Sequence, residues 1–442
     1  MPDVRPFRGV RYDVAQVGAL SDVVAPPYDV IGPTLQDRLY DSSPYNIIRL
    51  ELSRTAQADT EADNRYTRAA GFLHTWMRQG ILRVDDQPSL YLYEQTFEVE
   101  GQTHSRKGFF ARVRLEPFGQ GKVFPHEQTL AGPKADRLAL YQATGFNLSP
   151  IFGLYPDVAQ EVLRTVEAGL RDRTPLVATD HLGVVNRLWV VTDPGTHTAV
   201  QGLMADRPIF IADGHHRYET GLKYRDLLVQ SGQTEGIDDP ANFCMMMLVG
   251  MTDPGLLILP THRLVSGLAG LTGDELARRL EPEFELRRVG HGAEACHLTW
   301  EAISRGSGQD TLGFGTVADD SWLLARLRSD ESMDHLAADH SADWRSLGVS
   351  ILHVLVLGHL LAGHRSEAGK TDTSPSFPCR YVHLTSEVLV DIDARGCDLA
   401  CLVPPARMEH VEAIASNLET MPPKSTYFFP KLLTGMVLNP LR

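Results

Sequence analysis

Cysteine is scarce in this chain, and none of it is arranged as a known kind of site. Five cysteines are spread over 442 residues, and no two of them form a C-x-x-C pair. This pattern excludes a disulfide framework and a zinc knuckle and indicates a reducing compartment. The first residues also have no apolar signal core. We therefore expect a cytoplasmic protein.

Long apolar runs and basic patches are missing as well. The most apolar stretch, residues 347–362, contains Gly358 and two histidines and is too short to span a bilayer, so it predicts a buried helix and no membrane partner. The net charge is −14 without a basic stripe to offset it, which argues against nucleic acid as a partner. An acidic protein can still bind a phosphate through one local site, so nucleotides are not excluded.

Several familiar catalytic motifs are also absent. The chain has no Rossmann fingerprint, P-loop, nucleophile elbow or paired-carboxylate glycosidase pattern. Its composition, 43% hydrophobic and 22% charged, is that of an ordinary soluble protein, and its length allows two or three domains. Helix and strand patterns alternate along it, which predicts a mixed α/β fold.

The patterns suggest a division into three parts. Residues 1–116 are expected to form an N-terminal α+β region, with a strand running into a proline turn at residues 23–30, a helix at 66–77 and a hairpin of 90–99 with 108–115. Residues 117–265 contain nearly every unusual polar cluster. Residues 266–442 are expected to form a C-terminal α/β region that includes a helix at 273–280 and a hairpin of 311–315 with 322–327.

The most informative motif is Asp213-Gly214-His215-His216-Arg217. It follows a short apolar run and opens a predicted helix at residues 218–229. A strand, a glycine turn and a helix start bring backbone N–H groups and a positive dipole end to one point, which suits an anion. Arg217 adds a planar fork of donors for phosphate oxygens, and His215 and His216 add further donors.

Plainer interpretations of this motif stay open. A strand–glycine–helix junction is common in α/β proteins, and adjacent histidines often cap a helix or pair with a carboxylate. Asp213 could hold Mg²⁺ directly or through water, or it could cap the turn by bonding backbone N–H groups. Zinc is disfavoured for His215 and His216, because neighbouring side chains point apart and no third ligand lies at a metal spacing.

Four other basic residues are weaker candidates for the phosphate path. Lys134 and Arg137 precede the main motif, whereas His262 and Arg263 follow the apolar run 245–249, which predicts a buried strand. Ligands of α/β proteins usually bind at strand ends along one edge of the sheet. Charged residues at such places are also often solvated or ion-paired.

The polar clusters together resemble a large prokaryotic family known as domain of unknown function 1015. The resemblance is carried by Arg5-Pro6-Phe7, Ala25-Pro26-Pro27-Tyr28-Asp29, His126-Glu127-x-Thr129, Lys134-x-Asp136-Arg137, Ser149-Pro150-Ile151-Phe152, the 213–217 motif, Leu259-Pro260-x-His262-Arg263 and Met421-Pro422-Pro423-Lys424-Ser425-Thr426. These stretches cover nearly the whole chain.

A more distant resemblance concerns function. Free serine kinases of the ParB and sulfiredoxin-like superfamily share the Asp-Gly-His-His-Arg turn and carry a stretch that Pro125-His126-Glu127-Gln128 looks like. The resemblance implies a ParB/sulfiredoxin-like nucleotide-binding core, with Glu127 as general base beside His126 and the histidine–arginine turn as nucleotide phosphate ligands. It also implies ATP or ADP as phosphate donor and a small hydroxylated acceptor, for which free L-serine is the best single candidate.

This mechanism is physically coherent. A serine hydroxyl is a poor nucleophile, so a carboxylate within about 3 Å would take its proton. Charge neutralisation by Arg217, the helix N-terminus and Mg²⁺ would assist phosphoryl transfer. Glu127 and the 213–217 motif would then have to share one cavity. A nucleotide-binding regulator without kinase activity is the main rival. A sulfiredoxin-like reductase is disfavoured, since His215 stands where a cysteine would be needed.

Overall fold

The computed structural model describes residues 2–127, 131–172, 174–234, 236–364 and 377–442. Gln128 and Thr129, which belong to the motifs above, lie outside these ranges. The protein has a mixed α/β fold, as predicted, and forms two compact units. Unit 1 comprises Met1–Pro125, Thr129–Leu257 and Pro430–Arg442, and unit 2 comprises His126–Gln128 and Ile258–Phe429. Each unit is described by itself.

Unit 1 is built on a large mixed sheet. Its described strands follow the order β6-β11-β8-β12-β5-β4-β10-β9, and β1 pairs with β5. The strands of this unit are β1 (Val4–Arg5), β2 (Val10–Tyr12), β3 (Leu82–Val84), β4 (Leu90–Val99), β5 (Gln102–Arg114), β6 (Val123–Phe124), β7 (Phe146–Asn147), β8 (Ile151–Tyr155), β9 (Leu176–Thr179), β10 (Val185–Val191), β11 (Ile209–Asp213), β12 (Phe243–Gly250) and β21 (Asn439–Pro440). The sheet therefore combines strands from the predicted N-terminal and middle parts, and the three-part division stays a prediction.

The central strands explain where the core of unit 1 lies. β12 pairs in parallel with β8 and antiparallel with β5, and all its residues from Phe243 to Val249 are buried. A continuous apolar run is what a strand covered on both faces requires. On one face, Val162 and Val166 of one helix and Tyr218 of another join the apolar side chains of the strands in a single cluster.

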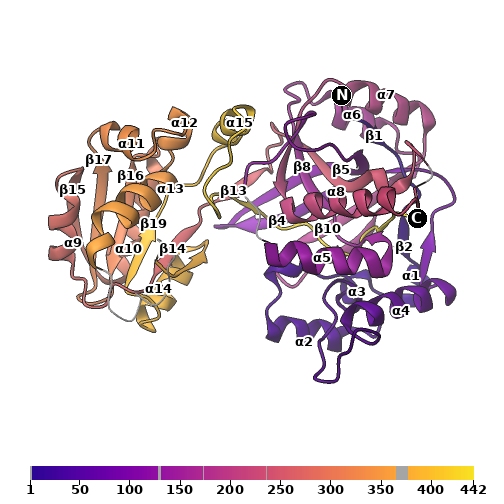
Figure 1. The fold of residues 1–442 in the computed structure, drawn as a ribbon, viewed down its shortest axis with the longest axis horizontal. Helices are drawn as coiled ribbons and strands as arrows, with labels where there is room; N and C mark the ends of the chain where they lie inside the picture. The colour runs from indigo at the N-terminus through magenta and orange to yellow at the C-terminus, as the bar shows by residue number, and fades with distance from the viewer. Residues whose placement is uncertain (1, 128–130, 173, 235, 365–376) are drawn as a thin grey trace. The chain divides into compact units, whose positions relative to one another are not determined.

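Helix α8 packs against β8 and β12 and lies over the sheet in Figure 1. Helix α5 packs against both α4 and α8, and α6 packs against α7. The helices are α1 (Val14–Val17), α2 (Pro33–Ser42), α3 (Ile48–Glu51), α4 (Arg65–Arg78), α5 (Ala131–Thr144), α6 (Glu161–Ala168), α7 (Pro194–Met204) and α8 (His215–Gln230), with short 3-10 turns η1 (Leu20–Asp22), η2 (Tyr28–Val30) and η3 (Pro240–Asn242).

Unit 2, coloured orange to yellow in Figure 1, has a second sheet. Its strands are ordered β15-β17-β16-β19-β14-β18. Successive residues of one central strand belong to different hydrophobic cores on the two faces of the sheet. Leu264 packs with Val388 of one helix, whereas Val265 packs with Leu276 of another. A period of two residues is expected for a strand between two layers of helices.

The elements of unit 2 are short and numerous. The strands are β14 (His262–Val265), β15 (Phe284–His291), β16 (Thr311–Thr316), β17 (Ser321–Leu327), β18 (Cys379–Val382), β19 (Leu399–Leu402) and β20 (Tyr427–Phe429); β13 (Leu257–Leu259) lies at the sequence boundary of the units. The helices are α9 (Gly273–Leu280), α10 (Gly292–Arg305), α11 (Glu331–Leu336), α12 (Ala342–Arg345), α13 (Gly348–Ser350), α14 (Thr385–Asp393) and α15 (Met408–Ser416), with a π-helix η4 (Ile351–Leu360) and a 3-10 turn η5 (Ala362–His364).

Most of the local predictions are confirmed. The expected helices match α4, α8 and α9, and the expected hairpins match β4 with β5 and β16 with β17. The apolar stretch near residue 350 is a buried helix, mostly of π type. Within the described ranges, every helix falls short of the length and apolarity that a membrane span needs.

The strand predicted at the start of residues 23–30 is wrong, whereas a turn does follow the prolines, as η2. Residues 23–27 connect the 3-10 turns η1 and η2, and among the described residues their one bridge joins Ala25 to Thr434. Pro26 and Pro27 have no N–H to donate to a ladder, which explains why the apolar residues before them do not continue into a sheet.

Candidate functional site

The predicted anion corner has the local geometry that its sequence indicates. Strand β11 ends at Asp213, and its register with β8 shifts between Ile211 and Asp213. Gly214 follows with φ 94°, in the left-handed region that favours glycine, and α8 begins at His215. The bulge and the glycine turn therefore bring the side chain of Asp213 to the N-terminal end of α8.

Asp213 is the centre of this corner. Its Oδ2 lies 2.5 Å from Nη2 of Arg217, and its Oδ1 lies 2.5 Å from Nζ of Lys431. Burial opposes ionisation of this carboxyl group, but the charges of Lys431 and Arg217 hold its pKa well below the ordinary value. Asp213 is therefore an anion at any physiological pH, and it orients two cationic side chains.

Arg217 is almost completely buried, with 4% of its side chain exposed. Besides Asp213, its guanidinium donates to the carbonyl oxygen of Pro150. Burial opposes its charge, yet the Asp213 carboxylate raises its pKa above the ordinary value. A permanently charged and fixed guanidinium is what a phosphate site needs.

The two histidines of the motif differ in burial. His215, the first residue of α8, is buried close enough to Asp213 to help lower the pKa of that carboxyl. His216 is half-buried, and its carbonyl oxygen accepts from Oγ1 of Thr220 within the helix. Both histidines therefore lie at the helix N-terminus, where the dipole favours an anion.

Two cations of unit 1 were missed from the sequence. Lys431 reaches Asp213 from the C-terminal segment, and no local pattern marks it as a site residue. Arg106 of β5 is fully buried, donates to Gln95 Oε1 and to the carbonyl oxygen of Pro430, and lies with its guanidinium 4.7 Å from the ring of Phe152. Burial lowers its pKa to about 10, so it still carries a positive charge at neutral pH.

Lys134 and Arg137, both on α5, have protein partners. Lys134 Nζ lies 2.7 Å from Oε2 of Glu219 on α8, and both side chains are partly exposed. Arg137 is buried, with Nη1 3.0 Å from Oε1 of Glu51 and Nη2 2.6 Å from Oδ2 of Asp136. These contacts match the ion-paired alternative, and the phosphate roles of both residues stay predictions.

His126 and Glu127 meet the C-terminal motif within unit 2. Nε2 of His126 lies 2.8 Å from Oγ1 of Thr426, and its carbonyl oxygen accepts from the N–H of Met421. Oε1 of Glu127 accepts from the N–H of Lys424 at 3.0 Å, and no hydrogen bond reaches its Oε2 from the described residues. The segment 421–426 therefore orients the predicted base through Oε1 of Glu127 and leaves Oε2 without a hydrogen bond from the described residues.

Arg263 contacts the same segment at the carbonyl oxygen of Lys424. Its Nη2 donates to the carbonyl oxygen of Lys424 at 2.9 Å, and its Nε lies 3.3 Å from Nε2 of His353. Lys424 itself has φ 59°, a conformation that a residue other than glycine adopts at a cost. The structure thus brings Glu127 and Arg263, two predicted site residues, to the backbone of one residue, Lys424.

His262 begins β14 and is fully buried against Trp300, with ring centroids 4.9 Å apart. Its Nδ1 accepts from the N–H of Val403, whereas its Nε2 has no hydrogen-bond partner among the described residues. Burial and the Arg263 charge lower its pKa to about 3. His262 and Arg263 open a strand of their own in the sheet of unit 2, and do not follow directly from the apolar strand β12.

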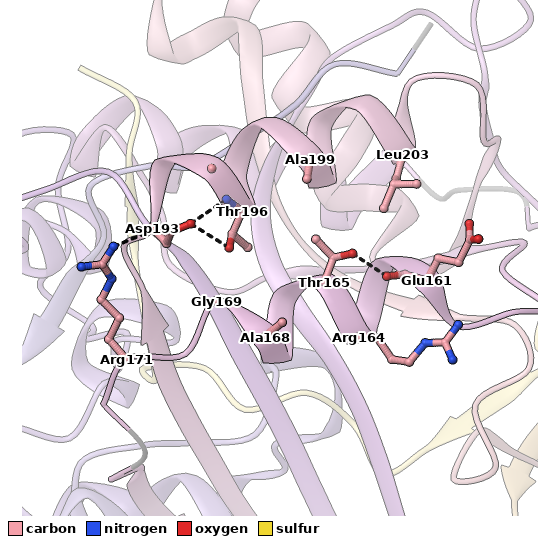
Figure 2. Close-up of a pocket in the computed structure, with 11 residues that line it drawn as sticks. Glu161, Arg164, Thr165, Ala168, Gly169, Arg171, Asp193, Thr196, Ala199 and Leu203 are labelled. Atoms are coloured by element: carbon pink, nitrogen blue, oxygen red, sulfur yellow. Dashed lines mark hydrogen bonds and ion pairs between the residues drawn. The ribbon is translucent and has the colours of Figure 1, made fainter.

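A shallow groove lies elsewhere in unit 1, between α6 and α7 (Figure 2). Its volume is about 780 Å³, and its polar lining includes Glu161, Arg164, Arg171, Asp193 and Thr196. Figure 2 shows Arg171 directed at Asp193, which also caps α7 through Thr196. The groove contains none of the residues predicted from the sequence.

Direct coordination of Mg²⁺ by Asp213 does not fit this geometry. Each oxygen of that carboxylate already contacts a cationic group, and placing a metal ion there would set three positive charges around one anion. Among the described residues there is also no group of three or more histidine, cysteine, aspartate or glutamate side chains that could hold a metal ion. The corner fits an anion, such as a phosphate, better than it fits a metal.

Comparison with solved structures finds only remote likenesses. The chain is similar to a conserved hypothetical protein from Pyrococcus furiosus at 13% identity and TM-score 0.33, covering 73% of this chain and 93% of that one. It is also similar to a free serine kinase in complex with AMP (13% identity, TM-score 0.34, 72% and 86% covered) and to SbnI with C-terminal truncation from Staphylococcus aureus (10% identity, TM-score 0.35, 75% and 87% covered). These scores are too low to carry an argument about activity.

Comparison with protein-family models identifies the family of this chain. No curated protein matches the chain. The model of a family described as a protein of unknown function, DUF1015, matches residues 4–350. This match covers well over half of the chain and includes the anion corner, the His126-Glu127 stretch and the Tyr28-Asp29 turn. The chain therefore belongs to the DUF1015 family.

Proposed function

We propose that this protein is a phosphotransferase that moves a phosphate from ATP or ADP to a small hydroxylated acceptor, with free L-serine as the first candidate. The observation that carries the proposal is the anion corner, where Asp213 holds Arg217 and Lys431 at 2.5 Å each beside the N-terminus of α8. The resemblance of the 213–217 motif to the turn of ParB/sulfiredoxin-like serine kinases supports the same reading.

The corner supplies the charge that phosphate binding requires. One carboxylate faces two permanent cations, so a net positive charge is left for the ligand. Both cations are largely buried, with 4% and 14% of their side chains exposed. Charges in such a place are weakly screened and interact strongly with phosphate oxygens. The backbone N–H groups at the start of α8 add to this attraction.

Glu127 is the proposed general base. The N–H of Lys424 fixes one of its carboxylate oxygens, and the other is the atom that would accept the proton of the acceptor hydroxyl. His126, tied to Thr426, is a positioning residue for this stretch. Mg²⁺, when it accompanies the nucleotide, would neutralise phosphate charge; because Asp213 does not fit as its direct ligand, no step here depends on it.

The experiment is transfer of labelled phosphate from ATP and ADP to a panel of free amino acids and polyols. Glu127→Gln keeps an oxygen that accepts from the Lys424 N–H but removes the base. We expect it to lower the transfer rate by at least about 100-fold, the usual contribution of a general base, without changing nucleotide affinity. Glu409→Gln, on the exposed side of α15, is the matched control and should leave the rate unchanged.

A double variant tests whether the two halves of the proposal belong to one reaction. If Glu127 and Arg217 serve the same transition state, Glu127→Gln combined with Arg217→Lys should slow transfer by less than the product of the single effects. Independent effects would contradict the proposed pairing. Tight nucleotide binding without transfer to any acceptor would instead favour a nucleotide-binding regulator.

A further inference from the structure

The turn of Tyr28 and Asp29 has no role in the reaction as described so far. It forms the 3-10 turn η2 directly after two prolines. Tyr28 is half-buried and Asp29 is exposed. The prolines restrict the backbone before the turn, so the two side chains are presented in a defined direction.

A chain of buried contacts connects this turn to the anion corner within unit 1. The guanidinium of Arg137 lies 4.1 Å from the centre of the Tyr28 ring. Arg137 pairs with Glu51, whose Oε1 also accepts from Oγ of Ser149 at 3.0 Å. The next residue is Pro150, whose carbonyl oxygen accepts from Arg217. Every link except the Tyr28 ring is nearly excluded from solvent, so buried side chains connect the turn to Arg217.

Asp29 is the one acidic residue of this arrangement that the protein itself does not use. No hydrogen bond or ion pair joins its carboxylate to any described residue, in contrast to Glu51, Asp136 and Asp213. The negative charge of Asp29 nevertheless acts on Arg217. Burial lowers the pKa of Arg217, and the charges of Asp213 and, after it, Asp29 raise that pKa most. Asp29 directly follows Tyr28 in η2, so its carboxylate lies at the end of the chain of contacts that leads to Arg217, and it is open to solvent.

We infer that Asp29 binds the ammonium group of an amino-acid acceptor whose phosphate donor lies at Arg217. This inference rests on the proposed phosphotransferase function and assigns its acceptor to the zwitterions. An ammonium group has three N–H donors and is well satisfied by one carboxylate and neutral oxygen atoms nearby. The Tyr28 hydroxyl is such an oxygen, because burial raises the pKa of Tyr28 to about 12 and keeps the phenol neutral.

A divalent cation suits the same carboxylate less well. Ca²⁺ and Mg²⁺ need six or more oxygen ligands in defined positions, and among the described residues Asp29 belongs to no group of three or more histidine, cysteine, aspartate or glutamate side chains that could hold a metal ion. Arg137 and Glu51 are then positioning residues, which hold the Tyr28 ring so that Asp29 faces the corner. Arg217 and Asp29 would bind opposite charges of the two substrates side by side.

Calorimetric titration of the full-length chain with L-serine and with glycerate, which has a hydroxyl in place of the amine, tests this inference. We expect wild type to bind L-serine more tightly than glycerate. Asp29→Asn should lower the affinity for L-serine at least about tenfold, which corresponds to the loss of a hydrogen bond to a charged group. The affinity for glycerate should stay unchanged. Asp29→Glu should restore part of the affinity. Asp41→Asn, which removes an exposed carboxylate of α2, is the charge-matched control.

The inference is overturned if wild type does not prefer L-serine, or if Asp29→Asn binds both compounds as wild type does. Its failure is distinct from failure of the proposed function. Phosphate transfer to amine-free acceptors at equal rate would refute the role of Asp29 and keep the phosphotransferase. Binding of L-serine that depends on Asp29, without any transfer, would keep the amino-acid site and refute the phosphotransferase.

Discussion

Nζ of Lys431 lies 2.5 Å from Oδ1 of Asp213, although 218 residues separate them in the chain. The contact ties the C-terminal segment of unit 1 to the end of β11. Because Asp213 also pairs with Arg217, one buried carboxylate fixes two cations at the proposed phosphate site.

Lys431→Met keeps most of the side-chain volume and removes the charge. Since Asp213 retains Arg217, the free energy of unfolding should fall by about 1–3 kcal/mol, less than for a buried charge left without any partner. Nucleotide affinity, measured by calorimetry, should fall at least about tenfold. Lys122→Met removes only exposed contacts with the carboxylate and the carbonyl oxygen of Asp206, and should change stability by less than about 1 kcal/mol. Unchanged nucleotide affinity in Lys431→Met would contradict the phosphate role of Lys431.

Gly214→Ala should lower both stability and nucleotide affinity, because the added methyl group strains the backbone and also meets Arg217. A Cβ at this position would lie 3.0 Å from Nε of Arg217 in a backbone of φ 94°. Gly232 also has positive φ, 68°, but a Cβ there would meet nothing within 4 Å. Both alanine variants should lose about 1–2 kcal/mol of stability, measured by urea unfolding. Only Gly214→Ala should also weaken nucleotide binding, because it displaces Arg217; equal binding in both variants would argue against this.

Arg137→Met should give a loss of stability that grows with pH. Burial raises the pKa of Glu51 even though Arg137 is its partner. A carboxyl with a raised folded-state pKa contributes stability below its unfolded pKa of about 4.3 and loses it as pH rises through the folded value. Without Arg137 that folded pKa should rise further, so the deficit should be small near pH 4 and reach about 3–5 kcal/mol near pH 7. Urea unfolding across this range is the measurement, and a deficit independent of pH would contradict the role of Glu51.

His262 should make the stability of unit 2 sensitive to mild acid. Burial and the charge of Arg263 lower its pKa to about 3, so the folded chain resists its protonation. Stability is full above the unfolded pKa of about 6.5 and falls toward pH 3 by as much as about 1.4 kcal/mol per pH unit. His262→Asn keeps an acceptor for the Val403 N–H but cannot titrate. Its unfolding free energy should therefore fall less steeply than that of wild type below pH 6.5, and identical slopes would exclude His262 as the cause.

The local elements of this fold could be read from the sequence because their signals are local. Helix α4 follows from apolar residues three and four apart, and the β4–β5 hairpin from two alternating runs around Glu100 and Gly101. The junction of β11 and α8 is likewise marked by an apolar run, a glycine with positive φ and a helical period. Residues 23–30 were misread because proline at two successive positions outweighs the β propensity of the preceding valines.

That Asp213, Gly214 and Arg217 lie together follows from the sequence alone, because residues at a strand–helix junction are neighbours whatever the rest of the chain does. Three long-range contacts follow only from the folded chain: Lys431 completes the ion pairs of Asp213, Lys424 binds Glu127 across 297 residues, and a chain of contacts connects Tyr28 to Arg217. Such pairings depend on which strands and segments pack side by side. That choice is made by burial of the whole core, to which no single stretch of sequence gives the answer.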